Sequence, residues 1–199
     1  MRMKRLLWIN ACMRGPEQSR TYALCKSFLE EWKHANPDGE VVERDLTRCE
    51  LKVMDAQLNQ LRDQTVETGK MDSSLLEIPR ELAEADCVVV GAPYWDLSFP
   101  AQLKVYLEWA STLNVTFHYD DQGKSEGLCK ADKLLYITTG GGPVYNRNHG
   151  YEYIKALSGM LGIHNTHCVA GEFLDVADGP CRENMRKAKE ALTQLARDW

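Results

Sequence analysis

The sequence predicts an α/β fold, in which helices cover both faces of a five-stranded parallel sheet. Residues 87–90 form a short, unbroken apolar run, which is typical of a strand buried on both faces. A turn and a helix that Pro100 can open follow this run. Strand-like and helix-like segments then alternate along the chain, and this alternation is typical of a parallel sheet with helical crossovers.

Apolar spacing and breaker residues define the elements of the first half. Residues 4–10 read as the first strand, and a helix begins near Ser19. Asn36 and the three residues after it end that helix, because Pro, Asp and Gly interrupt helical patterns. Residues 40–45 alternate in polarity and are predicted as a short second strand.

The next segment has a weaker pattern. Residues 46–70 are polar and are predicted as a long connection with helical fragments. A helix is expected over residues 72–85, where Pro79 either kinks it or marks a new first turn. The third strand, residues 87–91, and a helix from Pro100 to about Leu113 follow.

In the second half of the chain, strands and helices alternate again after a short hairpin-like segment. Residues 116–119 and 123–128 indicate a hairpin, and residues 133–138 the fourth strand. A helix over residues 151–161, a fifth strand over 167–171 and a last helix over 185–199 complete the chain. With 199 residues and no internal repeat or linker, the chain is expected to form one domain.

The charge and amino-acid composition exclude several classes of binding partner. The formal net charge of −5 and the lack of a basic stripe argue against nucleic acid and against an anionic membrane surface. The apolar run near the N-terminus is too short for a leader peptide, and no stretch approaches a membrane span. Seven scattered cysteines without a Cys-x-x-Cys motif predict reduced thiols in a cytoplasmic protein and no metal site.

Three loops are expected to leave the carboxyl edge of the sheet, where open α/β sheets bind ligands. The first, from Ala11, offers Ser19, Thr21 and the free N–H groups of a helix start, with Arg14 and Arg20 nearby. Such a start accepts anions such as phosphate, although Ser19 can equally be an ordinary N-cap.

The second and third loops offer aromatic and glycine residues. Tyr94 and Trp95 can flank a flat ring or simply cover the sheet edge. The third loop contains Thr139 and three glycines, with Tyr145 and His149 beyond it. Together the three loops predict a planar ligand with a phosphate tail, for which flavin mononucleotide (FMN) is the leading candidate.

The sequence resembles the FMN-dependent NADH:quinone oxidoreductases, also called azoreductases, of the flavodoxin-like superfamily. The likeness spans nearly the whole chain. The matching segments are residues 85–95, 100–106, 115–119, 139–142, 159–163 and 171–172, with Gly123, Gly127 and Leu128.

The resemblance implies a flavodoxin-like fold with strand order 2-1-3-4-5 and a homodimer with FMN sites at its interface. It implies that Ser19, Arg20 and Thr21 hold the FMN phosphate. Phe117 and Tyr119 would help to wall the substrate pocket, either of their own chain or of the partner subunit. The cofactor-binding residues expected in the three loops are Ala11, Ser19, Arg20, Thr21, Pro93, Tyr94, Trp95, Asp96, Leu97, Thr139, Gly140, Gly141 and Gly142.

Two segments depart from the family pattern. Residues 94–97 read Tyr-Trp-Asp-Leu where the family commonly has Met-Tyr-Asn-Phe. Residues 139–142 read Thr-Gly-Gly-Gly where it often has Ser-Arg-Gly-Gly. The second segment resembles the Thr-Gly-Gly loop of animal-type quinone reductases, which use a Tyr and a His after the loop. Tyr145 and His149 are therefore candidate catalytic residues, or else a loop tyrosine and a solvated histidine.

The expected activity is a two-electron, ping-pong reduction. NADH or NADPH would reduce FMN, and a quinone or azo compound would then be reduced in turn. Two other hypotheses stay open from the sequence. One is a flavodoxin-type electron carrier, and the other is a flavin-free binding protein on the same fold.

Overall fold

The computed structural model describes residues 3–177 and 179–199 and places five strands in one parallel sheet. These strands are β1 (Arg5–Asn10), β2 (Glu40–Asp45), β3 (Cys87–Gly91), β6 (Lys133–Thr139) and β7 (Asn165–Gly171). Their order across the sheet is β2-β1-β3-β6-β7. The strands β4 (Phe117–Tyr119) and β5 (Ser125–Gly127) form a separate antiparallel ribbon, so β6 and β7 are the fourth and fifth strands of the sheet.

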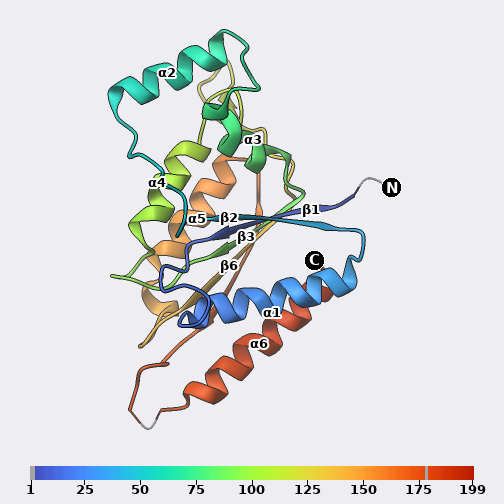
Figure 1. Cartoon of the computed structure of the whole chain (residues 1–199), viewed down its shortest axis with the longest axis vertical. Coiled ribbons are helices and arrows are strands. Elements are labelled where there is room, and N and C mark those ends of the chain that lie inside the picture. The colour runs from blue at the N-terminus through green and yellow to red at the C-terminus, as the bar shows by residue number, and fades with distance from the viewer. Residues whose placement is uncertain (1–2, 178) are drawn as a thin grey trace.

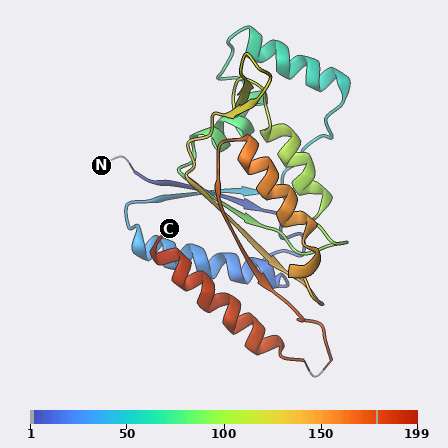
Figure 2. The same ribbon diagram turned by 180° about the vertical axis from the view of Figure 1, so that it is seen from behind.

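Helices cover both faces of this sheet, as the sequence predicted. Figures 1 and 2 show α1 and α6 together on one face, and α3, α4 and α5 on the other. The α-helices are α1 (Arg20–Ala35), α2 (Ala56–Glu67), α3 (Glu77–Glu84), α4 (Ala101–Ala110), α5 (His149–Met160) and α6 (Cys181–Arg197).

Two hydrophobic cores lie on opposite faces of the sheet because successive strand residues point to opposite sides. In β1, Leu7 and Ile9 face the core under α3, α4 and α5, whereas Leu6 and Trp8 face the core under α1 and α6. Residues 87–91 of β3 are all buried, which explains their unbroken apolar run. The α/β sandwich predicted from this pattern is confirmed.

The connection that the sequence predicted to contain helical fragments contains one helix of 12 residues, α2. Asp55 opens it, because its side chain accepts a hydrogen bond from the Leu58 N–H at 2.8 Å. Only Arg62 and Thr65 of the helix are buried, and both are polar. The buried face therefore gives no apolar stripe in the sequence. The Arg62 guanidinium donates to the Glu108 carbonyl at 2.9 Å and thereby ties α2 to α4.

Local hydrogen bonds set the other boundaries. Pro79 lies in the first turn of α3, a new helix that follows the 3₁₀ turn Ser74–Leu76. The helix α4 ends at Ala110, before the expected Leu113, because Thr116 Oγ1 donates to the Ala110 carbonyl at 2.9 Å.

The hairpin that the sequence indicated is present and lies beside the amino ends of β3 and β7. The Lys130 N–H donates to the Ala83 carbonyl, just before β3, and the Cys129 N–H donates to the Leu161 carbonyl, before β7. The loops after β1, β3, β6 and β7 leave the opposite, carboxyl edge. In the described part of the chain, no helix has the length and apolar character needed to cross a membrane.

Candidate cofactor site

Four segments at the carboxyl edge of the sheet enclose a cavity of about 180 Å³. Three of them are the loops that the sequence singled out, after β1, β3 and β6. The fourth follows β7 and was missed, because it contains no glycine cluster or aromatic pair. The lining residues are Arg14, Gln18, Ser19, Arg20, Thr21, Pro93, Tyr94, Trp95, Thr139, Gly140, Gly141, Leu174 and Asp175.

The start of α1 gives the cavity an anion-binding character. Ser19 is the N-cap, and its Oγ accepts a hydrogen bond from the Tyr22 N–H at 3.1 Å. Among the residues that the structure describes, no acceptor is found for the N–H groups of Arg20 and Thr21. These groups and the positive end of the helix dipole attract an anion, and the cations Arg14 and Arg20 line the same cavity.

Hydrogen bonds between the loops hold the cavity together. The Thr21 and Thr139 hydroxyls lie 2.6 Å apart and join the first loop to the third. The Tyr94 N–H donates to the Thr139 carbonyl at 3.0 Å, which joins the second loop to the third. The Gly140 N–H donates to the Gly171 carbonyl at 2.9 Å and links the third loop to the fourth.

Two glycines of the third loop lie close to neighbouring side chains. A Cβ at Gly140 would lie 2.5 Å from Val144 Cγ2, and one at Gly141 would lie 2.6 Å from Asp175 Oδ2. Such distances are well inside van der Waals contact, so a side chain would force its neighbours to move. Gly140 and Gly141 line the same cavity as the anion-binding helix start, and this combination fits a planar ligand that carries a phosphate.

The second loop contains a tight turn with an unusual backbone. Trp95 and Ser98 exchange two backbone hydrogen bonds, of 3.1 and 2.8 Å, around Asp96 and Leu97. These central residues have φ values of 49° and 69°, as a type I′ turn requires. A leucine in this left-handed region costs about 1–2 kcal/mol. Strain of this kind is concentrated at functional sites, and here the strained turn follows the exposed Trp95, which lines the cavity.

Several expected residues lie outside the cavity lining. Ala11 is fully buried, and Gly142, Asp96 and Leu97 are neighbours of lining residues. Phe117 and Tyr119 lie in the hairpin beside the amino ends of the strands, with ring centroids 5.6 Å apart. Their roles in a cofactor or substrate site stay predictions.

The two candidate catalytic residues are placed differently. The His149 N–H donates to the Leu97 carbonyl at 3.1 Å, so the start of α5 adjoins the strained turn. Tyr145 lines a different cavity, next to β7 and α6. Its hydroxyl oxygen accepts a hydrogen bond from the Ala170 N–H at 3.0 Å, and partial burial raises the pKa of Tyr145. The structure therefore brings only His149 near the second loop.

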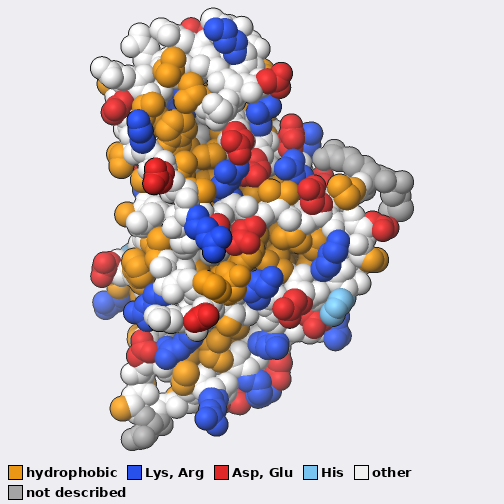
Figure 3. Space-filling model, in the orientation of Figure 1, with side chains coloured by type: hydrophobic (Ala, Val, Ile, Leu, Met, Phe, Trp, Pro, Cys, Tyr) orange, Lys and Arg blue, Asp and Glu red, His pale blue; other side chains and the backbone are white. Residues whose placement is uncertain are grey.

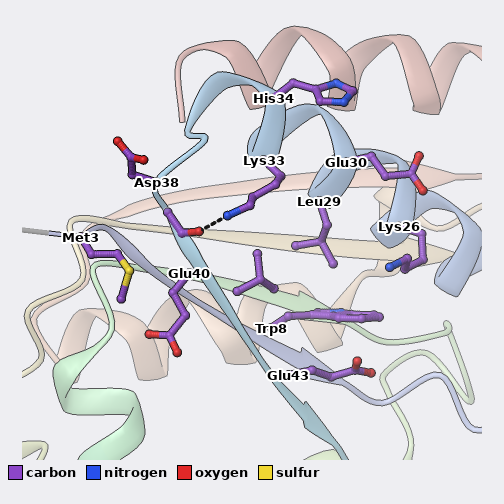
Figure 4. A pocket seen from close by; sticks show the side chains of 12 residues that line it. Met3, Trp8, Lys26, Leu29, Glu30, Lys33, His34, Asp38, Glu40 and Glu43 are labelled. Atoms are coloured by element: carbon purple, nitrogen blue, oxygen red, sulfur yellow. Dashed lines mark hydrogen bonds between the residues drawn. The ribbon is translucent and has the colours of Figure 1, made fainter.

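A larger cavity of about 980 Å³ lies away from these loops, between α1 and the edge strand β2. Figure 4 shows Trp8 and Leu29 facing this space, with Lys33, Glu40 and Glu43 around it. The Lys33 ammonium already donates to the Gly39 carbonyl at 2.5 Å. Positively and negatively charged side chains surround the cavity, and none of the loops at the carboxyl edge lines it. The smaller cavity is therefore the better candidate for the cofactor site.

Comparison with known proteins identifies the family. The family model of the flavodoxin-like fold matches residues 4–196, nearly the whole chain. The chain belongs to the flavodoxin-like fold family. Within that family, it is 32% identical to FMN-dependent NADH:quinone oxidoreductase 2 of Clostridium acetobutylicum, over 97% of this chain and 100% of that protein. The predicted resemblance to FMN-dependent NADH:quinone oxidoreductases is thereby confirmed.

Solved structures of flavodoxin-like proteins agree with this assignment. An azoreductase from Bacillus anthracis str. Sterne superposes with a TM-score of 0.87 at 25% identity, over 99% of this chain and 100% of that one. An FMN-dependent NADH-azoreductase from Bacillus anthracis str. Ames Ancestor, solved in complex with FMN, gives a TM-score of 0.81. Its identity is 22% over 98% of this chain and 100% of that one, so it supports the fold alone.

Proposed function

We propose that this protein is an FMN-dependent NAD(P)H oxidoreductase that reduces quinones, azo compounds or both. The observation that supports it best is the cavity at the carboxyl edge, where the free N–H groups of α1 lie beside the glycine loop. The relative from Clostridium acetobutylicum is an FMN-dependent NADH:quinone oxidoreductase, and the structurally similar protein from Bacillus anthracis str. Sterne is an azoreductase; both support this proposal.

The first loop would bind the cofactor phosphate. The N–H groups of Arg20 and Thr21 point out of the start of α1, and the Ser19 hydroxyl caps the same turn. Charge-assisted hydrogen bonds from a guanidinium to phosphate are stronger than neutral ones. Arg14 and Arg20 line the cavity and are the side chains that can supply such bonds.

The second and third loops would hold the flat ring. Bound here, FMN would supply hydride transfer from NADH or NADPH to a two-electron acceptor. Tyr94 and Trp95 would lie along the ring, with Pro93, Asp96 and Leu97 completing this loop, and the backbone of residues 139–142 would lie at its other end. The side chains of the chain thus orient the ring and its substrates, and none is required as a nucleophile. His149, beside the second loop, is retained as a candidate for contact with the flavin, whereas the Tyr145 hydroxyl bonds to Ala170 of β7.

We further infer a homodimer in which the partner completes the substrate pocket. Phe117 and Tyr119 lie beside the amino ends of β3 and β7, whereas the cavity lies at the carboxyl ends. These side chains cannot wall the cofactor site of their own chain, so they can serve that role only toward a second copy. Tyr119 is 57% exposed, which leaves its ring available for such contact.

Charge and thiol chemistry support a cytoplasmic enzyme that acts on small molecules. Figure 3 shows Lys and Arg interspersed with Asp and Glu on the face drawn, without a basic stripe that would bind nucleic acid. The cysteines of the chain are free thiols, as expected for a reducing compartment. We propose no role for nucleic acid or for a membrane.

The visible absorption spectrum of the purified protein, before and after anaerobic addition of NADH, tests the proposed function. We expect flavin bands that bleach directly to the two-electron reduced form and return when a quinone is added. A long-lived blue intermediate would instead indicate a one-electron carrier. A protein that stays colourless after incubation with FMN would contradict the proposal and favour a flavin-free binding protein.

A further inference from the structure

An ion pair lies across the mouth of the proposed phosphate site. Arg20 Nη1 is 2.6 Å from Asp175 Oδ1, and both side chains line the cavity. The two residues are 155 positions apart in the sequence, so the pair joins the start of α1 to the segment after β7. It uses one of the two guanidinium groups that the cavity offers to a phosphate.

The backbone places the Asp175 carboxylate at this position. The N–H groups of Phe173, Leu174 and Asp175 donate to the carbonyls of Gly142, Gly140 and Gly141, at 3.1 to 3.2 Å. The segment after β7 therefore lies directly along the glycine loop. Asp175 Oδ2 is so close to Gly141 that a Cβ on that glycine would approach it to 2.6 Å. Rotation of the Asp175 side chain, without movement of this backbone, would be enough to free Arg20.

The charge of Asp175 has the same sign as the expected ligand. Asp175 supplies the one carboxylate among the described residues that line the cavity. A phosphate monoester carries about two negative charges at neutral pH, so a carboxylate within a few ångströms opposes its binding. The Arg20 and Asp175 side chains are 44% and 65% exposed, and ion pairs this exposed contribute little to stability. The pair is thus easily broken by a stronger anion.

We propose that Asp175 is a specificity-determining residue that competes with the cofactor phosphate for Arg20. Its carboxylate holds the guanidinium until a phosphate displaces it, and it lowers the affinity of the protein for phosphorylated flavin relative to riboflavin. This inference rests on the proposed function, since it requires FMN to bind with its phosphate at the start of α1.

Equilibrium binding of FMN and of riboflavin to the flavin-free, full-length protein tests this role. Both dissociation constants follow from quenching of flavin fluorescence. Asp175→Asn keeps the shape of the side chain and removes its charge, and Asp175→Ala is a second variant. Glu17→Gln is the matched control, because Glu17 is an exposed carboxylate of the first loop that does not line the cavity. It removes the same charge from the same edge of the sheet.

We expect Asp175→Asn to tighten FMN binding about three- to tenfold at low salt, since the substitution removes a like charge that repels the phosphate. Riboflavin binding should change by less than about twofold, because the compound has no phosphate to repel. High salt should reduce the gain for FMN. The Glu17→Gln protein should bind both flavins as the unaltered protein does.

Other outcomes would overturn the assignment. Weaker FMN binding by both Asp175 variants would show that the carboxylate positions Arg20 for the phosphate. Equal tightening of FMN and riboflavin, or an equal effect of Glu17→Gln, would remove the link to the phosphate. If neither the unaltered protein nor any of the variants bound FMN, the proposed function itself would fail, and this inference would fail with it.

Discussion

Single side chains decide which parts of the loops can meet a cofactor. Thr21 and Thr139 meet at 2.6 Å and fasten two loops that lie far apart in the sequence. Tyr145 follows the glycine loop closely in the sequence, yet its hydroxyl is bonded to Ala170 on the edge strand β7. Proximity in sequence to a binding loop is thus a weak guide to where a side chain points.

The position of the Tyr145 hydroxyl predicts a structural effect without a catalytic one. We expect Tyr145→Phe to lower the free energy of unfolding by about 1 kcal/mol, because the Ala170 N–H loses its acceptor. The rate of flavin reduction by NADH in a stopped-flow experiment should stay unchanged. Tyr151→Phe is the matched control, since its hydroxyl bonds to Thr166 of the same strand at 3.1 Å. Slower reduction in Tyr145→Phe alone would place that hydroxyl at the flavin.

Contacts between whole elements fix the hairpin and thereby the proposed substrate wall. Gly127 of β5 packs against the turn after α5, where a Cβ would lie 2.0 Å from the backbone nitrogen of Gly162. Backbone atoms cannot move aside as a flexible side chain can. The close contact of two glycines therefore holds the hairpin, with Phe117 and Tyr119, against the end of α5.

Alanine substitutions at Gly127, which makes this contact, and at Gly159, which has free space around it, should have opposite effects on stability. Gly127→Ala should lower the free energy of unfolding by about 1–3 kcal/mol or more, as overpacking does in well-packed sites. Gly159→Ala, in the last turn of α5, meets no atom within 4 Å and should raise stability by less than about 1 kcal/mol through helix propensity. Urea unfolding of both variants measures the difference. A neutral Gly127→Ala would show that the hairpin can shift away from α5 freely.

Buried thiols on both sides of the sheet link the stability of the fold to pH. Burial raises the pKa of Cys87, Cys129 and Cys168 to about 12, from an ordinary value of 9.0. It also raises the pKa of Cys25, which is fully buried. These groups ionise in the unfolded chain before they ionise in the folded one, so the unfolded state binds fewer protons above pH 9.

The fold should therefore lose stability as pH rises from about 9 toward 12. Each such thiol contributes a decline of up to about 1.4 kcal/mol per pH unit in the free energy of unfolding. Below pH 9 the thiols are protonated in both states and should have no effect. Urea unfolding in steps from pH 7 to 10 measures this dependence, and Cys129→Ala should flatten it. A constant free energy across that range would mean that these thiols ionise equally in both states.

The sequence by itself determined the alternation of strands and helices, the buried run at β3 and the loops at the carboxyl edge. These features depend on local patterns, since the spacing of apolar residues sets which element forms and parallel strands end at one edge. The helix start at Ser19 and the glycine loop could be identified in the same way. The bounds of α2 within the predicted connection could not, because that mostly exposed helix has no apolar stripe.

Only the tertiary structure decided what lies opposite these loops. It brought Asp175 to Arg20, moved Tyr145 to β7 and placed the hairpin at the far edge of the sheet. Each of these facts depends on contacts between segments that are distant along the chain, and such contacts leave no periodic signal in the sequence. The sequence thus determined the fold class and the position of the cofactor loops, whereas packing decided which charges and rings meet there.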